Sequence, residues 1–190
     1  MKLKNVFKSM FAALMLFSCQ TLDKEQLTRD YYQSLEDADF ERVLSFQYDS
    51  VRVIESNYST TYAPKDYVHW LQWDAVFRPT YTILDLEVTV EGVAVMISKD
   101  DPRIRFLNDK PLLTKERLTF KGDKIYSLNI LEYVNLNNAT WNAKREKLVG
   151  WINKNHPELD GFIYDQTLEG GLNYKKALKL YQEASNNGPQ

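Results

Sequence analysis

The sequence predicts an α+β fold in which helices precede an antiparallel sheet. Apolar residues recur at helical spacing within residues 24–36, ahead of any strand. Apolar and polar residues then alternate strictly over residues 84–91, which is typical of a half-buried antiparallel strand. Glycine-containing turns at residues 91–92 and 121–124 follow, so the later strands are expected to form hairpins.

Three helices are expected in the first half of the chain. The first covers residues 24–36, and the run Asp37-Ala38-Asp39 separates it from a short second helix at residues 40–46. Pro64 suits the first turn of a third helix, because proline has no amide hydrogen to leave unsatisfied there. Pro79 marks the end of this helix.

At least five strands are expected, all of them antiparallel. Between the second and third helices, Val51 and Val53 indicate the first strand. In the second strand one face is apolar, formed by Leu84, Leu86, Val88 and Val90. The remaining strands are expected at residues 93–99, 112–120 and 125–134. Prolines and turn-forming residues within 100–111 indicate a long loop near a cavity mouth or a sheet edge.

Helical spacing returns after residue 134. Two further helices are expected, joined by a loop around Pro157 and Gly161. This segment contains Trp141 and Trp151, whose large apolar rings are costly to leave in water. We therefore expect both rings to be covered, and the mouth of the preceding domain is one candidate partner.

The N-terminus resembles a bacterial lipoprotein signal peptide. Three lysines precede an apolar run at residues 10–17, which is too short for the roughly 20 residues that a bilayer-spanning helix needs. The run Leu16-Phe17-Ser18-Cys19 is similar to a lipobox, which implies acylation of Cys19 with palmitate-type chains and a stable membrane anchor. The alternative is an ordinary secretory signal followed by a chance cysteine. Gln20, in place of the aspartate of an inner-membrane signal, favours the outer membrane of a bacterial cell envelope.

Charge and composition exclude several function classes. Cleavage after residue 18 removes three lysines and no acid, which changes the formal net charge from −2 to −5. Such a surface offers no positive field for nucleic acid. Cys19 is the only cysteine, so no disulfide is expected. The two histidines, His69 and His156, lack the spacing of a metal site, and we expect neither a metal nor another cofactor.

These observations divide the chain into four parts. Residues 1–18 are the expected signal peptide, and residues 19–25 a polar tether. One α+β domain is expected at residues 26–134 and a helical extension at residues 135–190.

The α+β domain resembles the nuclear transport factor 2-like (NTF2-like) superfamily, which includes polyketide cyclases and ketosteroid isomerases. The resemblance is carried by the order of the elements and by three runs, at residues 30–40, 46–51 and 120–125. It implies a cone-shaped fold, in which a strongly bent antiparallel sheet holds the N-terminal helices on its concave face, plus the C-terminal helical hairpin. It also implies possible pairing of two copies through the exposed sheet face.

Alignment with ketosteroid isomerase implies three catalytic residues. Tyr31 falls at the tyrosine that donates to the oxyanion, Glu55 at the general base, and Glu116 at the protonated acid. Other roles stay open for all three. Tyr31 lies on the expected core face of its helix, and both glutamates suit a solvated strand face or ion pairs, with Lys115 and Arg117 flanking Glu116.

The third helix supplies a candidate ligand-binding wall. Tyr67 and Trp70 are part of an aromatic group suited to a cavity wall, although such groups also form ordinary core. His69, between them, suits an acid, a base or a surface position.

Three classes of function remain after these exclusions. The leading interpretation is a non-enzymatic envelope lipoprotein that binds a small apolar or amphipathic ligand, or a protein partner. The second is an isomerase- or cyclase-like enzyme that uses Glu55 and Tyr31. The third is a structural module that forms a homodimer.

Overall fold

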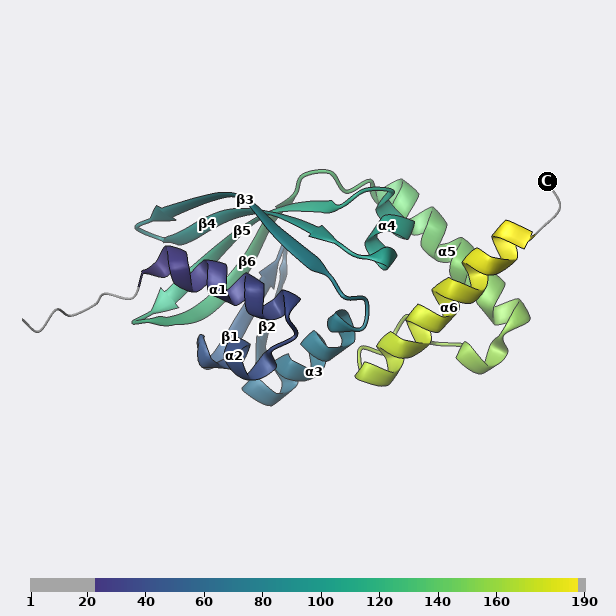
Figure 1. The fold of residues 1–190 in the computed structure, drawn as a ribbon, viewed down its shortest axis with the longest axis horizontal. Helices are drawn as coiled ribbons and strands as arrows, with labels where there is room; N and C mark the ends of the chain where they lie inside the picture. Colours follow the sequence, from purple (N-terminus) through teal and green to yellow (C-terminus); the bar gives the residue numbers. More distant parts are fainter. Residues whose placement is uncertain (1–22, 188–190) are drawn as a thin grey trace, which may run out of the picture.

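The computed structural model describes residues 23–187, in which the expected helices and strands follow in the expected order with one strand and one helix added (Figure 1). The helices are α1 (Lys24–Glu36), α2 (Phe40–Ser45), α3 (Pro64–Ala75), α4 (Pro102–Asn108), α5 (Asn138–Asn155) and α6 (Leu168–Asn187), with a short 3-10 helix at Pro157–Leu159. The strands are β1 (Gln47–Glu55), β2 (Tyr58–Tyr62), β3 (Thr80–Thr89), β4 (Gly92–Asp100), β5 (Leu112–Lys121) and β6 (Lys124–Tyr133).

The six strands form one curved sheet in the order β2-β1-β6-β5-β4-β3. Five strands were expected, and β2 is the addition, because its polar sequence carries no apolar alternation. The expectation that every pair is antiparallel is wrong at one place, since β1 runs parallel to β6. A long stretch of chain separates the two strands, since it contains α3, β3, β4 and β5. Such a connection lets β6 return beside β1 in either direction, so a parallel pair is possible.

Helices α1 to α3 pack on the concave face of the sheet (Figure 1). The first core lies between them and is formed by buried side chains that include Leu27, Tyr31, Leu71, Val95 and Leu118. Burying this apolar area is the main force that holds the helices on the sheet, at about 25 cal/mol per Å². The expected bent sheet with helices on its concave face is confirmed.

Local sequence sets the helix boundaries in this region. Asp23 caps α1 by accepting a hydrogen bond of 2.9 Å from the amide of Glu25. After α1 the chain turns through Ala38, whose φ of 54° is left-handed, and Asp39 caps α2 through the amide of Arg42. The break expected at residues 37–39 is confirmed.

The segment expected as a long loop contains helix α4. Asp101 accepts a 2.7 Å hydrogen bond from the amide of Ile104, Pro102 occupies the first turn, and Asp109 ends the helix with a left-handed φ of 65°. The prolines and aspartates that suggested a loop are instead the start and stop signals of a seven-residue helix.

Strand β3 is present as expected, but its apolar face is only partly covered. The register with β4 shifts between Ile83 and Asp85, which moves Leu84 out of the inward row. Leu84 and Val88 are each 51% exposed, and Val90 is fully exposed. The half-buried face predicted from alternation is therefore wrong for these three residues, because β3 is an edge strand with a bulge.

The C-terminal helices form a second core beside the first. Leu148 and Ile152 of α5 meet Tyr174 and Leu178 of α6, and Phe77, which follows α3, enters the same cluster. Trp151 packs edge to face on Tyr181, with ring centroids 5.7 Å apart. Figure 1 shows α5 and α6 side by side, away from α1 and the sheet.

The expected signal peptide and Cys19 lie outside the described residues. Among residues 23–187, no helix is both long enough and apolar enough to cross a bilayer.

Candidate functional site

A cavity of about 350 Å³ lies between α1, α3 and the concave face of the sheet. Its volume falls within the roughly 300–1,000 Å³ that is usual for small-molecule sites. Much of the wall is apolar, formed by Leu35, Leu71, Ile97, Leu128, Ile130 and Leu136. Polar side chains enter this wall in two groups, one of tyrosines with a glutamate and one of paired charges.

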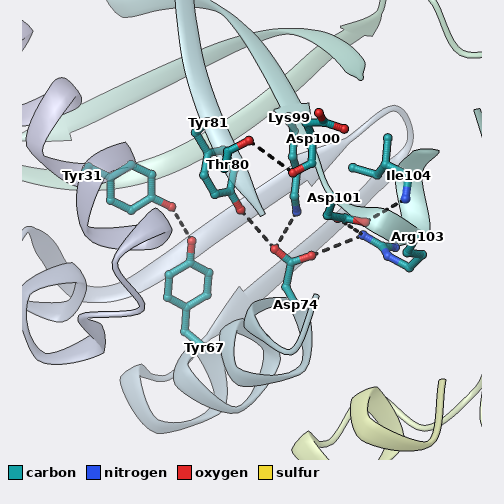
Figure 2. Close-up of polar contacts among 10 residues, drawn as sticks. All are labelled: Tyr31, Tyr67, Asp74, Thr80, Tyr81, Lys99, Asp100, Asp101, Arg103 and Ile104. Atoms are coloured by element: carbon teal, nitrogen blue, oxygen red, sulfur yellow. Dashed lines mark hydrogen bonds and ion pairs between the residues drawn. The ribbon is translucent and has the colours of Figure 1, made fainter. Parts of the chain in front are cut away.

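Two fully buried tyrosines form the first polar contact of the cavity. The hydroxyl oxygens of Tyr31 on α1 and Tyr67 on α3 are 2.6 Å apart and share a hydrogen bond (Figure 2). Burial raises the pKa of both phenols above the ordinary value, so both keep their hydrogens. The bond uses one of these two hydrogens, and within residues 23–187 neither hydroxyl makes another hydrogen bond. The second hydrogen therefore has no acceptor among the described residues.

Glu116 is a buried carboxyl at the same wall. Its two oxygens accept hydrogen bonds of 2.6 Å from the Tyr32 hydroxyl and the Thr114 hydroxyl. Burial raises the pKa of this carboxyl, while the two donors and the charge of Lys99 act in the opposite direction. The net pKa is above the ordinary value, which favours the neutral acid relative to a solvated glutamate.

The cations beside Glu116 in the sequence do not contact it. Lys115 forms an ion pair of 2.6 Å with Glu132, and Arg117 forms one of 2.5 Å with Glu91. Successive strand residues point to opposite faces, so both cations lie on the face away from the cavity. The two flanking cations therefore do not supply the neutralising charge that the sequence suggested.

A buried carboxylate organises the second polar group. Asp74 on α3 accepts from Lys99 at 2.6 Å, from the Tyr81 hydroxyl at 3.1 Å and from Arg103 at 3.4 Å (Figure 2). Burial alone would raise the pKa of Asp74, but the two cations and the hydrogen bonds hold it below the ordinary value. Arg103 also reaches Asp101, the residue that caps α4. The group thus connects α3, β4 and α4 at the cavity wall.

Glu55 lies at the rim of the cavity. It belongs to the lining but is exposed to solvent, and its carboxylate accepts a 2.7 Å hydrogen bond from the Tyr133 hydroxyl. Tyr31, Glu55 and Glu116 therefore all belong to the lining of one cavity. Glu55 differs from a desolvated general base because water reaches it.

The three ligand-binding candidates on α3 separate in the structure. Tyr67 and Trp70 line the cavity, where their rings stack with centroids 5.9 Å apart. His69 is exposed and is not part of the lining. The helical period explains the difference, since a residue between two inward positions of a surface helix points outward.

The C-terminal extension contributes to the cavity as well. Trp141 from the first turn of α5 and Leu136 from the preceding segment belong to the lining. The cavity mouth therefore covers part of Trp141, while Trp151 is half-buried and packs against the second core.

Sequence reasoning missed Asp74, Lys99 and Arg103. Two of them carried a detectable signal. Asp74 lies seven residues after Tyr67, on the buried face of α3, and Lys99 continues the inward alternation that includes Ile97 on β4. A charged residue at a position that the period assigns to the core indicates a buried polar site. Arg103 lay in the segment taken for a loop and carried no such signal.

Solved structures resemble this chain at low sequence identity. A protein from Kribbella flavida superposes with a TM-score of 0.51 at 10% identity, over 64% of this chain and 93% of that chain. An NTF2-like protein of unknown function from Cytophaga hutchinsonii gives a TM-score of 0.46 at 10% identity, over 57% of this chain and 88% of that chain. The chain therefore shares its fold with the Kribbella flavida protein.

A shared fold does not by itself assign a chemistry. The epoxide hydrolase/cyclase-like enzyme SalBIII also resembles this chain, with a TM-score of 0.48 at 11% identity over 56% of this chain and 88% of that chain. The sequence matches no protein-family model and no curated protein. Among residues 23–187, no group of three or more side chains is arranged to hold a metal ion. Function must therefore be argued from the cavity.

Proposed function

We propose that this domain binds a small amphipathic ligand in its cavity, without catalysis, as the soluble part of an envelope lipoprotein. The observation that carries the proposal is the combination of an apolar, aromatic wall with the spare hydrogen of the Tyr31–Tyr67 pair. A ligand with an apolar body and one acceptor oxygen fits both features. A phenol or a ketone has this chemistry.

The position of Glu55 supports binding rather than catalysis. A general base for a carbon acid works best with a raised pKa in a site that excludes water. Glu55 is exposed at the rim and is hydrogen-bonded to Tyr133. The buried acid, Glu116, is already occupied by two donors, Tyr32 and Thr114.

Calorimetric titration with 2-naphthol, an apolar phenol, tests the binding proposal. The wild-type protein is expected to bind this probe. The variant Ile130→Trp places a large ring in the cavity lining, so it should weaken binding at least tenfold, which corresponds to about 1.4 kcal/mol.

Leu131→Trp is the matched control, because Leu131 is the next residue of β6 and is 53% exposed. It should bind the probe as tightly as the wild type. Equal affinity of all three proteins, or no binding by any of them, would contradict the proposal.

The alternative is an isomerase- or cyclase-like enzyme, and the shared cavity of Tyr31, Glu55 and Glu116 is the observation that favours it. Such an enzyme would exchange protons next to the carbonyl of a ketone such as 2-tetralone in deuterated water. Exchange that is faster than in buffer and is lost in Glu55→Gln would support the enzyme over the binding module.

The envelope location rests on the signal-like N-terminus and Cys19. A Cys19→Ser variant should leave the membrane fraction of bacterial cells, because it lacks the acylation site. If this variant stays membrane-bound and the wild type incorporates no labelled palmitate, the lipoprotein proposal is wrong. Pairing of two copies through the sheet remains a further alternative, which the sedimentation coefficient of the purified domain would reveal.

A further inference from the structure

The start of α1 and two hairpin turns meet at one end of the domain. The β4–β5 register, in which Val93 lies opposite Leu118, brings the β3–β4 turn and the β5–β6 turn to the same end of the sheet. Lys24, the first residue of α1, has its Nζ 5.4 Å from the centre of the Phe120 ring on β5. Figure 1 shows the start of α1 and these strand ends together, opposite α5 and α6.

The length of chain before α1 limits where this end can lie. Cys19 precedes Asp23, the first described residue, by four positions. Four residues span at most about 15 Å, since neighbouring Cα atoms are about 3.8 Å apart. Acylation of Cys19 would therefore hold the start of α1 within a short distance of the membrane surface.

The side chains at this end suit a membrane interface. We define the tip surface as the side chains of Tyr48, Val90, Lys121 and Tyr126 at these strand ends. Val90 is fully exposed in a two-residue turn, where polar or glycine residues are usual, so its side chain adds no burial to the fold. Lys121 Nζ lies 3.6 Å from the ring centre of Tyr126 and 5.1 Å from that of Tyr48. Tyrosine and lysine are common at the level of lipid headgroups.

We propose that the tip surface rests on the membrane, so that the cavity mouth opens away from the bilayer. This inference depends on the lipid anchor of the proposed function. The contact is apolar and aromatic rather than electrostatic. Asp49 and Asp123 are close in sequence to the tip surface, and their negative charges offset the positive charges of the lysines at this end.

The strand length gives the distance of the mouth from the membrane. Strand β6 runs ten residues from the tip to Tyr133 at the cavity rim, and each residue of a strand rises about 3.3 Å. The mouth therefore lies about 30 Å from the tip surface. A ligand would reach the cavity from the aqueous side, or from a soluble partner, and not by lateral diffusion from the leaflet that holds the anchor.

Fluorescence quenching in vesicles tests this orientation. The full chain contains no cysteine besides Cys19, so a single introduced cysteine in the acylated protein can be labelled uniquely with an environment-sensitive dye. We choose Val90→Cys on the tip surface and, as the matched control, Leu172→Cys, which replaces a half-exposed leucine of α6. The vesicles contain phosphatidylcholine, phosphatidylglycerol and a lipid with a nitroxide headgroup.

The dye at residue 90 should be quenched at least twofold more than the dye at residue 172, and 0.5 M salt should leave the difference unchanged. Three results would overturn this inference alone, provided that the protein floats with the vesicles. They are equal quenching at both positions, stronger quenching at residue 172, and quenching that salt abolishes. If mass spectrometry finds no acyl chain on Cys19, the lipoprotein proposal and this inference fail together.

Discussion

The first region of this chain, formed by the sheet with α1 to α4, and the C-terminal helices are stabilised in different ways. Among the described residues, every buried polar or charged side chain other than a tyrosine lies between Thr28 and Ser127, and Tyr174 is the one buried tyrosine of the second core. The second core, centred on Leu148, Ile152 and Tyr174, is apolar and aromatic. Apolar packing alone can stabilise a core, as the second core shows. The presence of buried polar groups in the first region therefore needs a reason other than stability.

The proposed ligand binding supplies that reason. Burying hydroxyls and charges costs free energy unless they are paired, and paired groups often stabilise a core no better than apolar residues of similar volume. The first region also contains the cavity, and several of its buried polar groups, including Tyr31, Asp74 and Glu116, line it. The proposed site therefore accounts for the buried polar groups that line the cavity.

The largest expected effect is in the charged group of the first region. Asp74→Ala should lower the free energy of unfolding by about 3–5 kcal/mol, because it leaves Lys99 without its carboxylate partner and Arg103 with Asp101 alone. Urea unfolding measures this change. The double variant Asp74→Leu/Lys99→Met should recover most of the loss. A single variant that costs less than about 1 kcal/mol would contradict the role of Asp74.

The second core should respond to volume alone. Leu148 is fully buried, so Leu148→Ala should lower the free energy of unfolding by about 3 kcal/mol through lost contacts and a cavity. The control Leu172→Ala changes an exposed leucine of α6 and should stay within about 0.5 kcal/mol of the wild type. Similar unfolding curves for the two variants would show that the C-terminal helices are not packed as described.

A smaller, pH-dependent effect is expected at Glu116. Burial raises the pKa of this carboxyl in the folded protein above about 4.5, its ordinary value, so the folded state holds a proton that the unfolded chain has lost. The stability contributed by Glu116 is therefore complete below the unfolded pKa and falls as the pH rises toward the folded pKa.

Glu116→Gln removes this titration. Relative to the wild type, the variant should gain stability as the pH rises from about 4.5, at no more than about 1.4 kcal/mol per pH unit. Urea unfolding at several pH values measures the difference. Glu132→Gln, on the exposed face of β6, is the control and should follow the wild type. A constant difference between Glu116→Gln and the wild type would contradict a raised pKa.

Periodicity predicted most of this fold but not all of it. The turn chemistry at residues 37–39 and the helical spacing of Leu27, Tyr31 and Leu35 identified α1 and α2 because local interactions determine them. The parallel pairing of β1 with β6 depends on contacts between distant segments and leaves no local pattern. Helix α4 was missed because its capping residues are also turn formers.

The candidate site was predictable to a similar extent. The resemblance to ketosteroid isomerase located three lining residues, Tyr31, Glu55 and Glu116. It did not indicate that Tyr31 is bonded to Tyr67 or that Glu55 is at the rim, since both depend on how α1, α3 and β6 pack in space.

The double variant Tyr31→Phe/Tyr67→Phe tests the central claim most directly. Removing both hydroxyls leaves no unsatisfied partner, so the free energy of unfolding should change by less than about 1 kcal/mol. The affinity for 2-naphthol should fall about tenfold, because the spare hydrogen is gone. Calorimetry and urea unfolding of the same protein give both values. A variant that loses several kcal/mol of stability and binds the probe like the wild type would show that the hydroxyls serve the fold and not a ligand.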